Sequence, residues 1–106
     1  MPYDILLAPE AAADLRLLRA NVRAEVQDAL ERYLRPRPTE TSKSRIKRLR
    51  GVSRPQYRLR VGADIRVFYD VREATVEVLA IVPKSRAERW LRRHCEPDEE
   101  SGPVKS

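Results

Sequence analysis

The chain has 106 residues, of which 42% are hydrophobic and 36% are charged. A chain of this size and composition is expected to fold as one domain with a modest core. No apolar run approaches the roughly 20 residues that a membrane-spanning helix needs, and the first residues lack the basic and apolar regions of a secretory signal. The single cysteine, Cys95, excludes an internal disulfide and a zinc site built from cysteines alone. We therefore expect a cytoplasmic protein with no membrane partner.

The net charge is +6, and it is unevenly distributed. Residues 43–72 contain ten basic and two acidic side chains, so this segment has a net charge of +8. The rest of the chain contains 12 basic and 14 acidic side chains, which gives a net charge of −2. A concentrated positive charge favours a polyanionic partner such as nucleic acid, anionic lipid or an acidic protein segment. The alternative is an ordinary solvated charged face.

The first 35 residues predict a strand followed by two helices. Tyr3–Leu7 is typical of a short strand, and Pro9 suits the first turn of a helix, where a missing amide donor has no cost. Asn21 is expected to end this helix and to cap the next one. The second helix is indicated by apolar residues at helical spacing: Val22, Val26, Ala29, Leu30, Tyr33 and Leu34. The two helices are expected to form an antiparallel hairpin.

A loop and a group of strands follow. Pro36 to Ser44 is rich in proline and polar residues and predicts the loop. Ile46–Leu49 is expected to be a short edge strand. Tyr57–Val61 and Ile65–Val71 alternate strictly between two faces, which predicts a hairpin of two strands. Thr75–Val82 is apolar on both faces, so it predicts a strand inside the sheet.

The chain is expected to end with a short basic helix and an acidic tail. Ser85–Glu88 has the form of a capping box, which predicts the start of the helix. Residues 1–95 are therefore interpreted as one domain, and residues 96–106 as a disordered acidic tail. The predicted order is β-α-α-β-β-β-β-α. We expect an α+β fold in which the N-terminal strand and the helical hairpin pack on one antiparallel sheet of 4–5 strands.

The predicted hairpin brings arginines together. If its turn pairs Val61 with Ile65, Arg60 lies directly across from Arg66, on the face away from the helical hairpin. Like charges directly opposite in a sheet are destabilising, so this register suggests that an anion binds between the two guanidinium groups. The alternative is that the long side chains fan apart into water and cover apolar surface with their stems.

The chemistry available at such a site is limited. Arginine offers paired donors to phosphate oxygens and can stabilise a negatively charged transition state, but it stays protonated and is a poor base. His94, the only histidine, and Lys84 are the candidate proton carriers. Trp90 could stack on a base, although with Leu91 it is better interpreted as an anchor of the last helix. The sequence contains no clustered metal ligands, glycine-rich phosphate loop or nucleophilic triad, so we expect neither a metal nor a small-molecule cofactor.

Several segments together resemble the RelE/ParE toxins of type II toxin–antitoxin systems. The similar segments are Lys47–Gly51, Tyr57–Gly62, Ile65–Val71 and Val78–Val82, the last followed by Lys84 and Arg86. The likeness covers about residues 3–92 and is specific as a whole, although each segment alone is a weak motif.

The resemblance implies a toxin that is inhibited by a cognate antitoxin protein. In the RelE branch such a toxin enters the ribosome and cuts messenger RNA without a metal, using the RNA's own 2′-hydroxyl group, whereas in the ParE branch it poisons DNA gyrase. An RNA-cleaving toxin is the preferred prediction, a gyrase inhibitor is the second, and a non-enzymatic basic nucleic-acid-binding protein is the third.

The resemblance also implies roles for individual residues. Arg60, Arg66 and Arg86 are the expected catalytic residues. The expected substrate-binding residues are Arg58, Lys84, Trp90, Lys47 and Arg48. Arg58 and Arg60 stand where lysines are typical, and Trp90 stands near an expected tyrosine. Transition-state stabilisation is therefore a safer assignment for the arginines than base catalysis.

Overall fold

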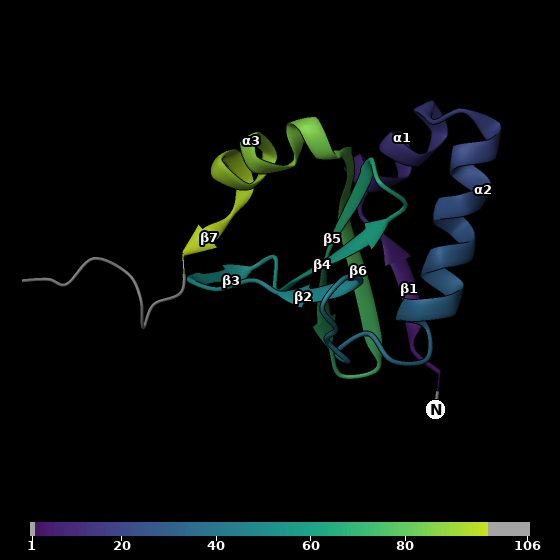
Figure 1. Ribbon diagram of the computed structural model, residues 1–106. Helices are drawn as coiled ribbons and strands as arrows, with labels where there is room; N and C mark the ends of the chain where they lie inside the picture. The colour runs from purple at the N-terminus through teal and green to yellow at the C-terminus, as the bar shows by residue number, and fades with distance from the viewer. Residues whose placement is uncertain (1, 98–106) are drawn as a thin grey trace, which may run out of the picture.

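The computed structural model describes residues 2–97 (Figure 1). Its elements are β1 (Asp4–Leu7), α1 (Pro9–Leu17), α2 (Ala20–Ala29), a π-helical turn η1 (Leu30–Leu34), β2 (Ile46–Arg48), β3 (Val52–Arg54), β4 (Tyr57–Val61), β5 (Ile65–Arg72), β6 (Thr75–Pro83), α3 (Lys84–His94) and β7 (Glu96–Pro97). No helix among the described residues is long and apolar enough to span a membrane. The predicted α+β class is confirmed.

The main sheet has five strands in the order β1-β6-β5-β4-β2. Thr75–Pro83 has a neighbour on each side, which confirms its predicted place inside the sheet. The expectation of a wholly antiparallel sheet is wrong at one edge, because β1 pairs with β6 in parallel. Parallel neighbours need a long connection between them, and here nearly the whole domain separates the two strands.

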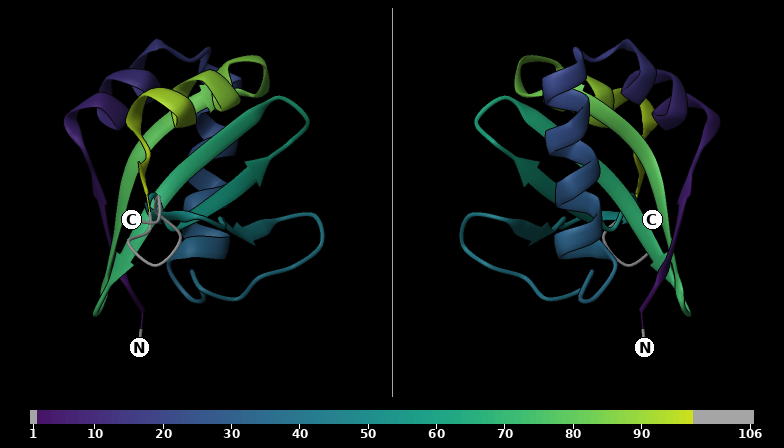
Figure 2. Two further views of the ribbon diagram at one scale, coloured as in Figure 1. Left: turned by 90° about the vertical axis from the view of Figure 1, so that its left-hand side faces the viewer. Right: turned by 90° about the vertical axis from the view of Figure 1, so that its right-hand side faces the viewer.

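The two helices α1 and α2 cover one face of this sheet (Figure 2). Beneath them the inward residues of the strands, such as Leu59, Val67 and Tyr69, are fully buried. The two helices cover different strands, because α1 packs on β6 whereas α2 reaches β4. Apolar residues of both helices join those of the strands in one core.

The junction between α1 and α2 also differs from the prediction. The second helix begins at Ala20, and no side chain caps its N-terminus, so Asn21 is not its cap. Instead Arg23 reaches back and donates hydrogen bonds to the carbonyl oxygens of Leu15 and Leu18, at 3.2 and 2.9 Å. Carbonyl groups at the end of a helix lack partners within it, and a guanidinium group satisfies two of them here.

The helix α3 lies over the opposite face of the sheet, near one end (Figures 1 and 2). Its residues Ala87, Trp90 and Leu91 pack on a small buried cluster of Phe68, Ala80 and Val82, which confirms the predicted anchoring role of Trp90 and Leu91. The predicted capping box is wrong, because α3 begins at Lys84 and has no side-chain cap. The Lys84 amide instead donates to the carbonyl oxygen of Asp64, which fastens the helix to the β4–β5 turn.

A second, two-stranded sheet of β3 and β7 was not predicted. Arg54 pairs with Glu96 across it, and Val52 pairs with Pro97. The first two residues of the expected acidic tail thus form a strand, and residues 98–106 lie outside the described part of the chain. This pairing holds the segment after α3 close to the edge of the main sheet, beyond β2 (Figure 1).

Candidate polyanion-binding site

Basic residues from β2, β4 and β5 meet on the sheet face that carries α3. The hairpin has the predicted register, with Arg60 directly across from Arg66, and Lys47 lies across from Arg58. Arg58 is also the cross-strand neighbour of Phe68, on which α3 packs. We call Arg58, Arg60 and Arg66 the arginine cluster.

Arg66 is the most buried member of the cluster, with only 6% of its surface exposed. Its Nη1 donates to the carbonyl oxygens of Ala63 and Ile65, at 3.3 and 3.0 Å. Burial lowers the pKa of Arg66, the positive charges of Arg58 and Arg60 lower it further, and the negative charge of Asp64 opposes these effects in part. The side chain faces away from α1 and α2 as expected, but it is enclosed by the protein and does not fan out into water.

The other two members have few hydrogen-bond partners. Arg60 is exposed, and its Nε donates only to the Gly62 carbonyl oxygen, at 3.3 Å. The Nε of Arg58 is buried and has no hydrogen-bond partner within residues 2–97. No member of the cluster forms an ion pair among the described residues. Because buried donors are normally hydrogen-bonded, this geometry favours an external anion as the missing partner.

The carboxylate that follows Arg66 on the same strand is occupied elsewhere. Asp70 extends from β5 and is 5% exposed, but its Oδ2 lies 3.5 Å from Nε of Arg54, and its Oδ1 accepts a hydrogen bond from the Gln56 amide. Arg54 also contacts Glu77 at 3.2 Å and Glu96 at 3.9 Å. Burial raises the pKa of Asp70 despite these contacts. Asp70, Glu77 and Glu96 are thus gathered around Arg54, whereas Asp64 raises the pKa of Arg66 without forming an ion pair with it among the described residues.

The predicted residues of α3 lie beside the cluster. Val82, the cross-strand neighbour of Arg66, lines a cavity of about 380 Å³ together with Arg86 and Trp90. The Trp90 ring stacks on Phe68, with ring centroids 5.0 Å apart, and on His94, with centroids 4.7 Å apart. Arg89 and Arg93 add further positive charge to the lining of this cavity.

Glu10 belongs to the same cavity, and the sequence analysis did not identify it. Its Oε2 accepts a hydrogen bond from Nε1 of Trp90, at 3.1 Å. Eighty residues separate the two side chains in the chain. No local pattern could therefore have indicated that they meet.

One predicted residue, Arg48, lies apart from the cluster. Arg48 shares the opposite face with Ile46, and its Nη1 donates to the carbonyl oxygens of Gln56 and Leu49. Its guanidinium group also lies 5.3 Å from the centre of the Tyr57 ring, so it braces the sheet edge. Lys84 is exposed at the first position of α3. Within residues 2–97, no group of three or more acidic, histidine or cysteine side chains is arranged to hold a metal ion.

Comparison with protein families supports the resemblance in the sequence. Residues 5–88 match the family described as the ParE toxin of the type II toxin–antitoxin system parDE. This match covers most of the described domain. The chain therefore belongs to the ParE toxin family of type II toxin–antitoxin systems, within the RelE/ParE superfamily. No curated protein sequence matches the chain.

Solved structures of other proteins share this fold. A chain of the archaeal RelE–RelB complex from Pyrococcus horikoshii is 26% identical, with a TM-score of 0.58, covering 81% of this chain and 99% of that one. A chain of the RelBE2 toxin–antitoxin complex from Mycobacterium tuberculosis is 22% identical, with a TM-score of 0.59, covering 79% and 100%. A copper-bound mutant toxin from Helicobacter pylori is 19% identical, with a TM-score of 0.53, and the match covers 79% of this chain and 97% of that one.

Proposed function

We propose that this toxin is a metal-independent endoribonuclease that cuts messenger RNA on the ribosome. The observation that carries the proposal is the arginine cluster, in which Arg60 and Arg66 face each other and have no carboxylate partner within residues 2–97. A phosphodiester placed between them would supply the missing negative charge. Arginine can contact two phosphate oxygens at once, which fixes the orientation of the group as well as its position.

The reaction would be an internal transfer within the RNA. The 2′-hydroxyl oxygen attacks the neighbouring phosphorus, its proton passes to a base, and the 5′-oxygen leaves with a proton from an acid. The products are a 2′,3′-cyclic phosphate and a 5′-hydroxyl group, and no water is consumed in this step. The arginine cluster stabilises the additional negative charge on the phosphorus oxygens, and Arg86 contributes from α3.

The proton carriers would come from the start and the end of α3, since arginine does not exchange its proton at working pH. His94 lies on the Trp90 ring, and its Nδ1 is 3.0 Å from the Trp90 carbonyl oxygen. Lys84 is the alternative. Because Trp90 already stacks with Phe68 and His94, its substrate-binding role is to hold this edge of the cavity in place. Lys47 and Arg58 would bind phosphates on either side of the cut.

The test is a reconstituted translation system to which the purified toxin is added. Protein synthesis should fall, and ribosome-associated messenger RNA should carry new 5′-hydroxyl ends. Free RNA of the same sequence serves as the control for dependence on the ribosome. Intact messenger RNA at toxin concentrations that stop protein synthesis in this system would contradict the proposal.

Inhibition of DNA gyrase is the second candidate function. It is favoured by the match to the ParE toxin family and by the small number of proton carriers near the arginine cluster. A gyrase inhibitor needs a basic binding surface but no acid or base. Loss of gyrase supercoiling together with intact messenger RNA would select this candidate. A third possibility, non-enzymatic binding of nucleic acid, predicts binding without either effect.

An antitoxin is the proposed protein partner for either function. The Pyrococcus and Mycobacterium structures are complexes of a toxin with an antitoxin. A partner for this chain is expected to be acidic, because positive charge is concentrated in residues 43–72. Co-expression with the antitoxin should relieve growth arrest.

A further inference from the structure

The cavity beside α3 has a single acidic residue in an otherwise basic lining. We call it the Glu10 cavity, and its polar lining consists of Glu10, Arg86, Arg89, Arg93, His94 and the indole of Trp90. Its volume of about 380 Å³ is within the range of roughly 300–1,000 Å³ that is typical of small-ligand pockets. One carboxylate beside three arginines is complementary to a ligand that has both hydrogen-bond donors and negative charge.

The Glu10 carboxylate is held in one orientation but is only partly occupied. Its Oε2 accepts a hydrogen bond from Nε1 of Trp90 at 3.1 Å, and its Oε1 has no hydrogen-bond partner within residues 2–97. None of the three arginines of the cavity forms an ion pair with Glu10 in that range. An ionised carboxylate has about four acceptor positions and no donor. Most of these positions therefore remain for a ligand that offers N–H groups.

An aromatic stack contributes to the same lining. The planes of Phe68 and Trp90 differ by 5° with ring centroids 5.0 Å apart, and those of Trp90 and His94 differ by 20° with centroids 4.7 Å apart. Phe68 is fully buried, whereas His94 is exposed. The stack thus ends at the surface in the His94 ring, on which a planar base can lie. Stacking engages the face of this ring, so the nitrogens at its edge stay available for proton transfer.

The Glu10 cavity adjoins the arginine cluster. Val82, which also lines the cavity, is the cross-strand neighbour of Arg66. A nucleotide in the cavity would therefore be next to the phosphate bound by the arginine cluster, and Arg89 and Arg93 would bind phosphates of the same strand. A carboxylate repels phosphates, so it is the base of this nucleotide, rather than the backbone, that is directed toward Glu10.

We propose that the Glu10 cavity binds a guanine base of the RNA substrate. Guanine has two adjacent donors on its Watson–Crick edge, N1–H and the N2 amino group, and the two carboxylate oxygens can accept both. Adenine and cytosine each have one amino donor beside an acceptor nitrogen, and uracil has one donor between two acceptor carbonyl groups. In each of these three bases the carboxylate would face an acceptor. Trp90 is a positioning residue, because its Nε1 sets the orientation of the carboxylate.

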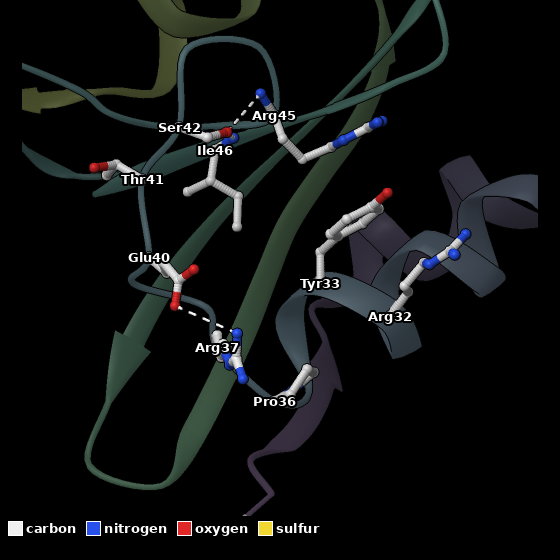
Figure 3. A pocket seen from close by; sticks show the side chains of 9 residues that line it. All are labelled: Arg32, Tyr33, Pro36, Arg37, Glu40, Thr41, Ser42, Arg45 and Ile46. Carbon is white, nitrogen blue, oxygen red and sulfur yellow. Dashed lines mark hydrogen bonds and ion pairs between the residues drawn. The ribbon is translucent and has the colours of Figure 1, made fainter.

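The larger cleft at Tyr33 lacks this combination of groups. It has a volume of about 440 Å³ and lies between the end of the second helix and the loop before β2 (Figure 3). Glu40, the only acid of its lining, lies 3.9 Å from Arg37. The Arg45 guanidinium lies over the Tyr33 ring, 4.6 Å from its centre. The carboxylate and one face of the ring are thus already shared with arginines, and a guanine would gain less there than in the Glu10 cavity.

The inference rests on the proposal that the substrate is RNA, but not on its cleavage. The probes are four RNA pentanucleotides with uridine at every position except the central one, which is G, A, C or U. Their 2′-hydroxyl groups are methylated, so that the probes are not cut. Each is titrated with the full chain by fluorescence anisotropy, and quenching of Trp90, the only tryptophan of the chain, reports that the cavity is occupied. The parent should bind the G probe about tenfold or more tightly than the other three.

The variants separate base recognition from phosphate binding. Glu10→Gln should reverse the preference from G to A, because an amide offers one acceptor and one donor and can still accept from Trp90. Trp90→Phe keeps an aromatic ring but loses the N–H donor, so it should reduce the preference for G. Arg89→Gln with Arg93→Gln should weaken all four probes equally. The matched control is Glu88→Gln, on an exposed position of α3 outside the cavity, which should leave the preference unchanged.

Melting curves of each variant show whether it is folded. Equal affinity of the parent for the four probes would overturn the inference, as would an unchanged preference for G in folded Glu10→Gln. If 5′-guanosine monophosphate binds as tightly as the G probe, the cavity takes a free nucleotide and the assignment to RNA is overturned. If the parent prefers the G probe but cuts no messenger RNA, the endoribonuclease proposal fails and the cavity assignment stands. Messenger cleavage without a preference for G would have the opposite meaning.

Discussion

Replacing Arg66 by methionine removes one charge from the arginine cluster and keeps most of the buried stem. The change loses the hydrogen bonds to Ala63 and Ile65, each contributing about 1 kcal/mol to stability. It also removes a buried charge that is repelled by Arg58 and Arg60. Exchanging buried charges for apolar groups is often neutral or stabilising by about 1–4 kcal/mol. The two effects are of similar size, so the free energy of unfolding should stay within about 1 kcal/mol of the parent value or rise.

The effect of the same replacement on activity should be far larger. Losing one preorganised charge donor typically lowers a rate by about 10²- to 10³-fold, so messenger cleavage by Arg66→Met should fall by at least ~10²-fold. Arg66→Lys should restore only part of it, because a point charge cannot supply the paired donors of arginine. The assays are messenger cleavage in the reconstituted system and growth arrest in cells, with a denaturant titration of each variant.

Arg16→Met is the matched control, because Arg16 is exposed on α1 and remote from the cluster. Arg23 is unsuitable as a control, since its guanidinium bonds to the end of α1. A folded Arg66→Met protein that cleaves at the parent rate would refute the site assignment. A loss of more than ~3 kcal/mol in the free energy of unfolding would instead show that Arg66 is primarily structural.

Three further outcomes are expected. Inorganic phosphate should raise the melting temperature of the parent protein more than that of Arg66→Met, because phosphate binds the folded arginine cluster. An equal rise in both proteins would contradict an anion site. Tyr69→Phe should lower the free energy of unfolding by about 1–2 kcal/mol, measured by denaturant titration, because the Pro38 carbonyl oxygen loses its buried donor. Asp70 has a folded-state pKa raised above its ordinary 3.8, so protonation favours the folded state and this contribution is lost as pH rises through the folded pKa. The stability of the parent minus that of Asp70→Asn should therefore be larger below pH 3.8 than at neutral pH, and a constant difference would exclude this titration.

The local patterns of the sequence predicted the central hairpin of the sheet better than the strand pairings at its edges. The alternation in Tyr57–Val61 and Ile65–Val71, with a three-residue turn between them, was sufficient to place Arg60 opposite Arg66. The parallel pairing of β1 with β6 and the small β3–β7 sheet join segments far apart in the chain. Such pairings depend on packing of the whole domain, which no window of sequence contains.

The same limit applies to the candidate site. The sequence placed Arg66 on the face away from α1 and α2 but did not predict its burial, which depends on its neighbours on that face. Glu10 reaches Trp90 only because α1 and α3 meet at one end of the sheet. Arg48 was grouped with Lys47 by sequence, but adjacent residues of a strand point to opposite faces.

The two faces of the sheet have different roles: one face stabilises the fold, and the other carries the proposed binding site. Leu59 and Val67 are fully buried under the helices, whereas Arg58 and Arg66, their neighbours in sequence, bring like charges together on the other face. Burial of the apolar face offsets this charge repulsion, because that face continues through β4, β5 and β6 beneath α1 and α2. An anion that binds the arginine cluster supplies the missing counter-charge and stabilises the folded state by mass action. The residues that weaken the free protein would thus be the ones that strengthen its complex, and for this reason a more stable Arg66 variant is expected to be a less active one.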